Sequence, residues 1–202
     1  MKPLKQMKQA GFTLIETMVV VFVIGVIMYL SAPALKGVTT GPTSKQIYDF
    51  ASKAATNWRH LNTTCGTTTD IATSNVVATP SATNAMALIV SGTSSTYLNP
   101  TYSGCANESG IQLLHTKVSG SVGAYKIAGY PITWSGGGSL PIKFVVSGVP
   151  TEVALPLYKQ YSSAANASIA TTFPTGADNT DPIFQFTDVG SNGTADVTLV
   201  IN

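Results

Sequence analysis

The feature that most constrains this chain is a long apolar stretch close to its beginning, headed by a single acidic residue. Glu16 precedes residues 17–35, which are nineteen positions without a charged side chain and end before Lys36. As a helix, such a stretch spans about 28 Å, close to the thickness of the hydrocarbon core of a bilayer. We therefore expect a membrane-inserted helix, in which a carboxylate requires a specific role because charges at membrane depth are costly.

The residues before this stretch form a short basic leader. They carry Lys2, Lys5 and Lys8 and no acidic side chain before Gly11. Positive charge next to an apolar helix is typical of the side of the membrane that stays in the cytoplasm. The sequence therefore predicts that the amino end remains inside.

A basic leader, a Gly11-Phe12 junction, Glu16 and an apolar helix together resemble the class III signal of type IV pilins and pseudopilins. The resemblance covers residues 1 to about 64. It implies that a prepilin peptidase cleaves between Gly11 and Phe12 and methylates the new amino group of Phe12. It also implies helix-softening and helix-kinking roles for Gly25 and Pro33.

The chemistry of Glu16 can be examined independently of that resemblance. Cleavage would place an α-ammonium on Phe12, four residues before Glu16 and on nearly the same face of the helix. The two charges can pair within one subunit or between neighbouring subunits. In the second case, the cost of a buried unpaired charge favours adding subunits in one register, which is the assembly role that the resemblance assigns to Glu16.

Two simpler interpretations stay open. Ala32-Pro33-Ala34 also fits the end of an ordinary secretory signal, whose cleavage after Ala34 would release a secreted soluble binding domain. A plain membrane anchor would account for the length of the apolar stretch. Neither interpretation requires Glu16 or the Gly11-Phe12 junction.

Charge argues against several other classes of function. Charged residues make up 10% of the chain, against about 25% in typical proteins. Without the leader, eight basic side chains face nine acidic ones, a net charge of −1. Nucleic-acid binding through bulk charge is therefore unsupported, and nucleic acid enters only as the cargo of a fibre. No nucleophile with a base and an orienting group can be assembled, so we predict no enzyme activity and no cofactor.

The pattern after the apolar stretch predicts an α+β fold. The segment 37–42 is rich in Gly, Thr and Pro and predicts a break in the helix, with Thr43 or Ser44 capping a second, amphipathic segment that ends near residue 64. Its apolar face recurs at helical spacing. That face consists of Ile47, Phe50, Ala51, Ala54, Ala55, Trp58 and Leu61.

The remaining residues, 65–202, predict one globular head with an antiparallel sheet. Helices are expected at 82–90 and 151–165, and strands at 111–118, 124–134, 140–146, 183–189 and 195–201. Asn192-Gly193 predicts a hairpin between the last two strands. The predicted organisation is therefore a leader (1–11), an inserted and polymerising helix (12–36), an amphipathic helical half (37–64) packed on the sheet, and the head.

Two further sets of residues in the head are candidates for a site. Cys65 and Cys105 are the only cysteines, and in an oxidising exterior we expect them to form a disulfide whose closure stabilises by about 4 kcal/mol in the chain-entropy model. Asp188, Asn192 and Asp196 are weak calcium candidates, because Gly190 and Leu199 occupy positions where a calcium loop needs oxygen ligands. We therefore predict no metal site.

Taken together, the residues and the resemblance predict a structural subunit. The resemblance implies storage in the inner membrane, polymerisation with copies of itself into a pilus on the cell surface, and dependence on a prepilin peptidase, an assembly platform protein and an ATPase. A pseudopilin of a type II secretion system is the principal alternative. Adhesion, motility and DNA uptake are not separated by the sequence.

Overall fold

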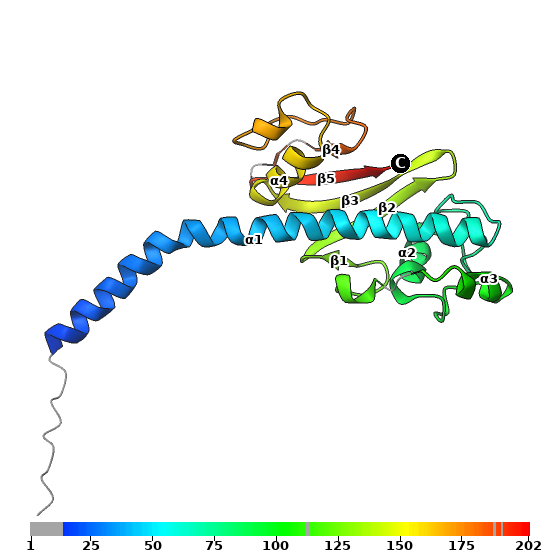
Figure 1. The fold of residues 1–202 in the computed structure, drawn as a ribbon, viewed down its shortest axis with the longest axis horizontal. Helices are drawn as coiled ribbons and strands as arrows, with labels where there is room; N and C mark the ends of the chain where they lie inside the picture. Colours follow the sequence, from blue (N-terminus) through cyan, green and yellow to red (C-terminus); the bar gives the residue numbers. More distant parts are fainter. Residues whose placement is uncertain (1–13, 112–113, 188, 191) are drawn as a thin grey trace, which may run out of the picture. The chain divides into compact units, whose positions relative to one another are not determined.

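The computed structural model describes residues 14–202 except 112, 113, 188 and 191, and the side chains of 14 and 29–40 lie outside the description. The chain forms two compact units that meet between residues 39 and 40. Helix α1, Leu14–Thr64, contributes to both units (Figure 1). Residues 14–39 are helical throughout, and the second unit holds the remainder of α1 and the sheet.

The predicted break at 37–42 is wrong, because α1 continues through these residues without interruption. Ser44 does not cap a new helix either; its buried hydroxyl donates to the carbonyl oxygen of Val153 at 2.7 Å. Glycine and proline disfavour helix by about 1 and 3 kcal/mol per residue, but this preference is weak beside tertiary packing. The burial of one face of the next five turns of α1 outweighs it.

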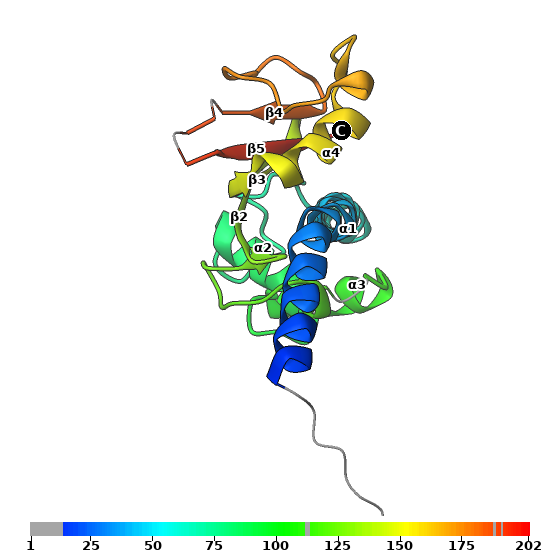
Figure 2. The ribbon, with the colours of Figure 1, turned by 90° about the vertical axis from the view of Figure 1, so that its left-hand side faces the viewer.

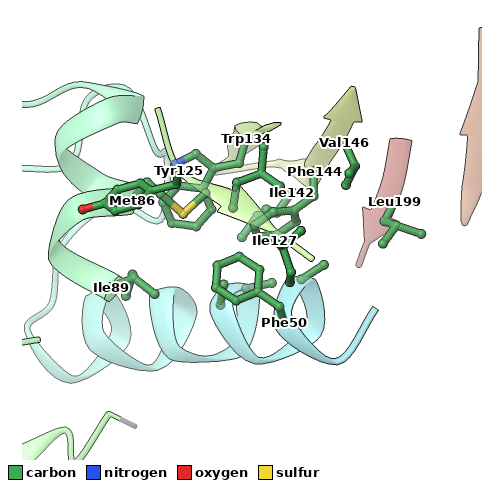
Figure 3. Close-up of a cluster of buried hydrophobic side chains, with 14 of the residues drawn as sticks. Phe50, Met86, Ile89, Tyr125, Ile127, Trp134, Ile142, Phe144, Val146 and Leu199 are labelled. Carbon is green, nitrogen blue, oxygen red and sulfur yellow. The ribbon is translucent and has the colours of Figure 1, made fainter. Parts of the chain in front are cut away.

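The second half of α1 packs on the head through the apolar face that the sequence predicts. All seven residues of that face are buried. Phe50 lies edge-on to Phe144, with ring centroids 6.3 Å apart, and Figure 3 shows it in a cluster with side chains of the sheet. The amphipathic character predicted for this segment is confirmed.

The sheet has five strands, all antiparallel to their neighbours, in the order β1-β2-β3-β5-β4. Their bounds are Lys126–Ile127 (β1), Tyr130–Gly137 (β2), Leu140–Pro150 (β3), Phe184–Phe186 (β4) and Thr194–Ile201 (β5). Helix α2, Ala82–Ser91, contacts β2, and α4, Thr151–Tyr161, contacts β3, β4 and β5 (Figure 2). The predicted α+β class is therefore confirmed.

The short elements complete the head. They are α3 (Ser103–Glu108) and the 3-10 turns η1 (Pro100–Tyr102), η2 (His115–Lys117) and η3 (Ala167–Ile169). Helix α2 begins where the sequence predicts, with the Ser81 hydroxyl accepting from the backbone N–H of Asn84 at 3.1 Å. Helix α4 begins at Thr151 as predicted and ends at Tyr161, four residues early.

Two strand predictions are corrected. The segment 124–134 is not one strand, because a turn at Ala128-Gly129, both at positive φ, divides it into β1 and β2. The described part of 111–118 contains the turn η2 and no strand. β-Branched residues indicate a tendency to extend, but the turn residues between them decide where a strand ends.

Candidate functional site: an apolar assembly helix

The first unit presents apolar side chains on every side of α1. Within residues 15–28, eleven large apolar side chains are exposed. They are Ile15, Met18, Val19, Val20, Val21, Phe22, Val23, Ile24, Val26, Ile27 and Met28, with exposed fractions from 41% at Val26 to 72% at Phe22. A helix that is apolar all round is stable where lipid or other helices surround it, because single soluble chains rarely expose patches of this size. We name residues 15–28 the apolar assembly helix.

Glu16 is the acidic residue of the first turn of α1, and its side chain is exposed. A carboxylate near a helix amino terminus interacts favourably with the helix dipole. Gly11 and Phe12, the predicted cleavage and methylation site, lie outside the described residues. The structure therefore places one partner of the predicted charge pair and leaves the other as a prediction.

Gly25 lies inside the apolar assembly helix, where a Cβ atom would meet no atom within 4 Å. Gly25 is thus not required by packing within this chain. Pro33 lies in a helical part of α1, but its side chain is outside the description. The softening and kinking roles of Gly25 and Pro33 remain predictions.

A helix that crosses a membrane must be both long enough and predominantly apolar. Among the described residues, no helix combines the length and the apolar character that crossing a membrane requires.

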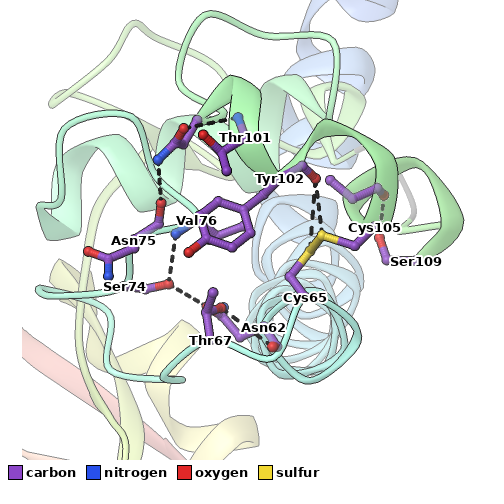
Figure 4. Close-up of a disulfide and its surroundings, with 12 residues drawn as sticks. Asn62, Cys65, Thr67, Ser74, Asn75, Val76, Thr101, Tyr102, Cys105 and Ser109 are labelled. Carbon is purple, nitrogen blue, oxygen red and sulfur yellow. Dashed lines mark hydrogen bonds between the residues drawn. A yellow bond between two sulfur atoms is a disulfide. The ribbon is translucent and has the colours of Figure 1, made fainter.

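The head is fastened to α1 by the predicted disulfide. Cys65 follows the last residue of α1 and is bonded to Cys105 in α3, with the two Cα atoms 5.2 Å apart (Figure 4). Next to it, the buried Asn62 donates to the carbonyl oxygen of Trp58 at 2.8 Å and accepts from the hydroxyls of Thr67 and Ser74. These bonds fix the loop that follows α1, because buried polar groups are stable only when paired.

A second polar centre, Asp181, orders the long connection between α4 and β4. Its carboxylate accepts from the backbone N–H groups of Ile183 and Phe184 and from Ser162 and Ser163 at 2.7–3.0 Å. Burial raises the pKa of this carboxyl, but the hydrogen bonds together lower it by more, and the resulting pKa is about 2. Asp181 is thus a structural anion within the head.

The calcium candidates do not converge. Asn192 uses its side-chain oxygen to accept from the backbone N–H and the hydroxyl of Thr194 at 3.2 and 2.8 Å, and Asp196 accepts from the N–H of Gly148 at 2.8 Å. Asp188 lies outside the described residues. Within the part of the chain that the structure describes, no three His, Cys, Asp or Glu side chains are grouped to hold a metal ion.

One polar feature of α1 was missed by the sequence reasoning. Opposite its buried face, nine polar or exposed residues line two pockets along the helix. They are Pro42, Lys45, Gln46, Asp49, Ser52, Lys53, Thr56, Asn57 and His60. Their three- and four-residue spacing is the same helical period that identifies the apolar face, so the sequence carries the signal for both faces.

A comparison with known protein families matches the segment that contains the candidate site. The family model of the prokaryotic N-terminal methylation motif matches residues 6–28, which include the Gly11-Phe12 junction, Glu16 and the apolar assembly helix. No curated protein and no solved structure matches the chain. The chain carries the class III signal of type IV pilins and pseudopilins, and its α+β fold is consistent with the pilin fold.

Proposed function

We propose that this chain is the precursor of a pilin-like structural subunit. It is cleaved between Gly11 and Phe12, methylated at Phe12, held in the inner membrane and then polymerised into an extracellular type IV pilus. The observation that carries the proposal is the apolar assembly helix with Glu16 in its first turn, inside a matched methylation motif. Such a helix is stable in apolar surroundings, and a bundle of identical helices provides them.

In this proposal, assembly exchanges lipid for the helices of other copies. The apolar side chains lose little in that exchange, because lipid tails and leucine side chains are similarly apolar. Direction and register come from the charges: the Phe12 ammonium of an arriving subunit pairs with Glu16 of its neighbour. An unpaired charge buried in the bundle would cost roughly 3–5 kcal/mol per subunit.

The head remains outside the bundle and forms the surface of the fibre. The disulfide and the buried Asn62 stabilise it in an oxidising exterior. The partners implied are copies of this chain, a prepilin peptidase, an assembly platform protein and an ATPase. No substrate or cofactor is part of the proposal.

The test replaces Glu16 by Gln in the only copy of the gene. Processing should continue, and the intact mass should still begin at methylated Phe12, but sheared filaments should be absent because the ammonium has no partner. Glu108→Gln makes the same chemical change at an exposed position of the head and should assemble normally. Abundant filaments from correctly processed Glu16→Gln protein would contradict the charge-pairing step.

The same cells distinguish the two fibres that this subunit can build. Loss of long surface filaments on deletion of the gene would support the pilus. Retained filaments together with loss of protein secretion would identify a pseudopilin of a type II system instead. A mature protein that begins at Leu35 would overturn both, because an ordinary signal peptidase would then have removed the apolar assembly helix.

A further inference from the structure

The polar face of α1 borders a groove that the proposed function does not use. Two pockets, of about 250 and 330 Å³, share Lys53 and follow one another along the helix. The first is closed on its other side by Lys117 of η2, and the second by Ser109, Gly110 and Ile111. From Pro42 to His60 the groove follows about 27 Å of helix. We name these two pockets the lysine groove.

Basic side chains outnumber acidic ones in the groove. Lys45, Lys53 and Lys117 line it, against one acidic side chain, Asp49. The chain without its leader has eight basic residues, so three of them lie in one groove, although its net charge is −1. Polar side chains between the lysines, Gln46 and Asn57 among them, add hydrogen-bonding groups.

Three of the acidic side chains with at least partial exposure lie on one part of the head, whereas Asp70 lies in the loop after α1 and Glu108 ends α3 next to Ser109 of the groove. Glu152 is in the first turn of α4, Asp178 is bonded to the edge of β4, and Asp196 is in β5. In Figures 1 and 2, α4, β4 and β5 lie on one side of the head portion of α1, whereas α3 lies on the other side. The same head thus carries a basic surface and an acidic surface on different elements.

We propose that the lysine groove receives the acidic surface of the head of a second copy of this chain. Two different patches in contact make a heterologous interface, which repeats without closing and so builds a filament. Complementary charge also fixes orientation and rejects wrong registers. The inference rests on the proposed function, because it names the contact between heads that accompanies packing of the apolar assembly helices.

A protein surface suits the groove better than a nucleic-acid backbone. Asp49 lies between Lys45 and Lys53 on the same helix face, where it would repel a continuous run of phosphates. A folded partner presents discrete carboxylates and can also offer a cation or an amide to Asp49. Polymer phosphate has no such group.

The test combines charge reversal with cross-linking. The double variant Lys45→Glu, Lys53→Glu should form about tenfold fewer filaments, because like charges then meet at every added copy. The matched pair of single variants is Lys53→Glu and Lys126→Glu, which make the same change in net charge, the second at an exposed position of β1 outside the groove and outside α4, β4 and β5. Lys126→Glu should assemble close to the wild-type level.

Zero-length carbodiimide cross-linking of sheared wild-type filaments tests the partner directly. Dimer bands should contain peptides that join Lys45, Lys53 or Lys117 to Glu152, Asp178 or Asp196. Equal filament counts for Lys53→Glu and Lys126→Glu would overturn the inference, as would dimer bands without groove lysines. Unchanged filaments that lose binding of double-stranded DNA would assign the groove to nucleic acid and overturn it too.

This test separates the inference from the proposed function. If wild-type cells assemble no fibre or pseudopilus, the proposed function fails. If wild-type filaments form and depend on Glu16 but not on Lys45 and Lys53, only the inference about the lysine groove fails.

Discussion

The two parts of α1 both carry apolar residues but use them differently. In the apolar assembly helix these side chains surround the helix and are exposed, as at Phe22 with 72%. In the head portion they form one stripe and are buried, as at Trp58 with 0%. The first part therefore depends on a partner or a membrane for its stability, whereas the second part is stabilised by the contacts of its own chain.

This difference teaches how one helix can serve two tasks. A helix with an apolar stripe at a period of 3.6 residues packs through that stripe, and its opposite face can be polar. A helix that is apolar on all sides can pack against any apolar neighbour, so that copies of the chain can replace lipid around it. Substitutions in the two parts should accordingly affect different measurements.

The largest effect on the stability of the head is expected from Trp58→Ala. The ring of Trp58 lies 5.5 Å from that of Trp134, and its indole N–H donates to the carbonyl oxygen of Thr69 at 2.7 Å. Removing it leaves a cavity and an unpaired carbonyl, so the free energy of unfolding should fall by about 3–5 kcal/mol. Denaturant unfolding of the mature chain in mild detergent, followed by near-ultraviolet circular dichroism, measures this change.

Ile24→Ala supplies the matched control, because Ile24 is large and apolar but 46% exposed. It should change the unfolding free energy of the head by less than about 0.5 kcal/mol. Trp58→Phe should give an intermediate loss, since a ring remains but the hydrogen bond to Thr69 does not. Equal losses for Ile24→Ala and Trp58→Ala would show that the two parts of α1 are not energetically distinct.

A smaller effect is expected from removing the disulfide, which also belongs to the head alone. Cys65→Ser with Cys105→Ser should lower the unfolding free energy by about 2–4 kcal/mol, mainly because the unfolded chain gains freedom. The double variant and the wild type should differ under oxidising conditions and become similar after reduction. A difference that persists in full after reduction would instead indicate that the sulfur atoms matter through packing.

Much of the fold follows from local patterns in the sequence. The stripe on α1, the Ser81 cap of α2 and the β-branched runs of β3 and β5 each determine their element over a few residues. The same is true of the disulfide, since the chain has only two cysteines. For the candidate site, residues 11–16 already predict the processing signal that the family model matches.

The parts that could not be predicted depend on contacts between distant residues. Gly137 illustrates this: at φ +86°, a Cβ atom there would lie 2.1 Å from the carbonyl oxygen of Thr69. Gly137 lies in β2 within a run of three glycines, and only the fold reveals that the chain after α1 passes directly against this end of the strand. The continuation of α1 through Pro42 is similar, because packing of the following turns decides it.

The smallest predicted effect concerns pH and separates the head from the apolar helix once more. The folded pKa of Asp181 is about 2, below its ordinary value of 3.8, so the unfolded chain binds more protons between these values. The stability that Asp181 contributes, about 2 kcal/mol, should be complete above pH 5 and should be lost as pH falls toward 2. Hydrogen bonds from Thr180 also lower the pKa of Asp178, so this residue acts in the same direction.

The contribution of Asp181 can be isolated by measuring Asp181→Asn beside the wild type. The variant should be less stable at pH 7. Between pH 5 and pH 2 its free energy of unfolding should fall by about 2 kcal/mol less than that of the wild type, because the titrating carboxyl is gone. Glu16→Gln, in the other part of the molecule, should leave the pH profile of the head unchanged. Parallel profiles for the wild type and Asp181→Asn would show that the carboxylate does not hold the connection between α4 and β4 as an anion.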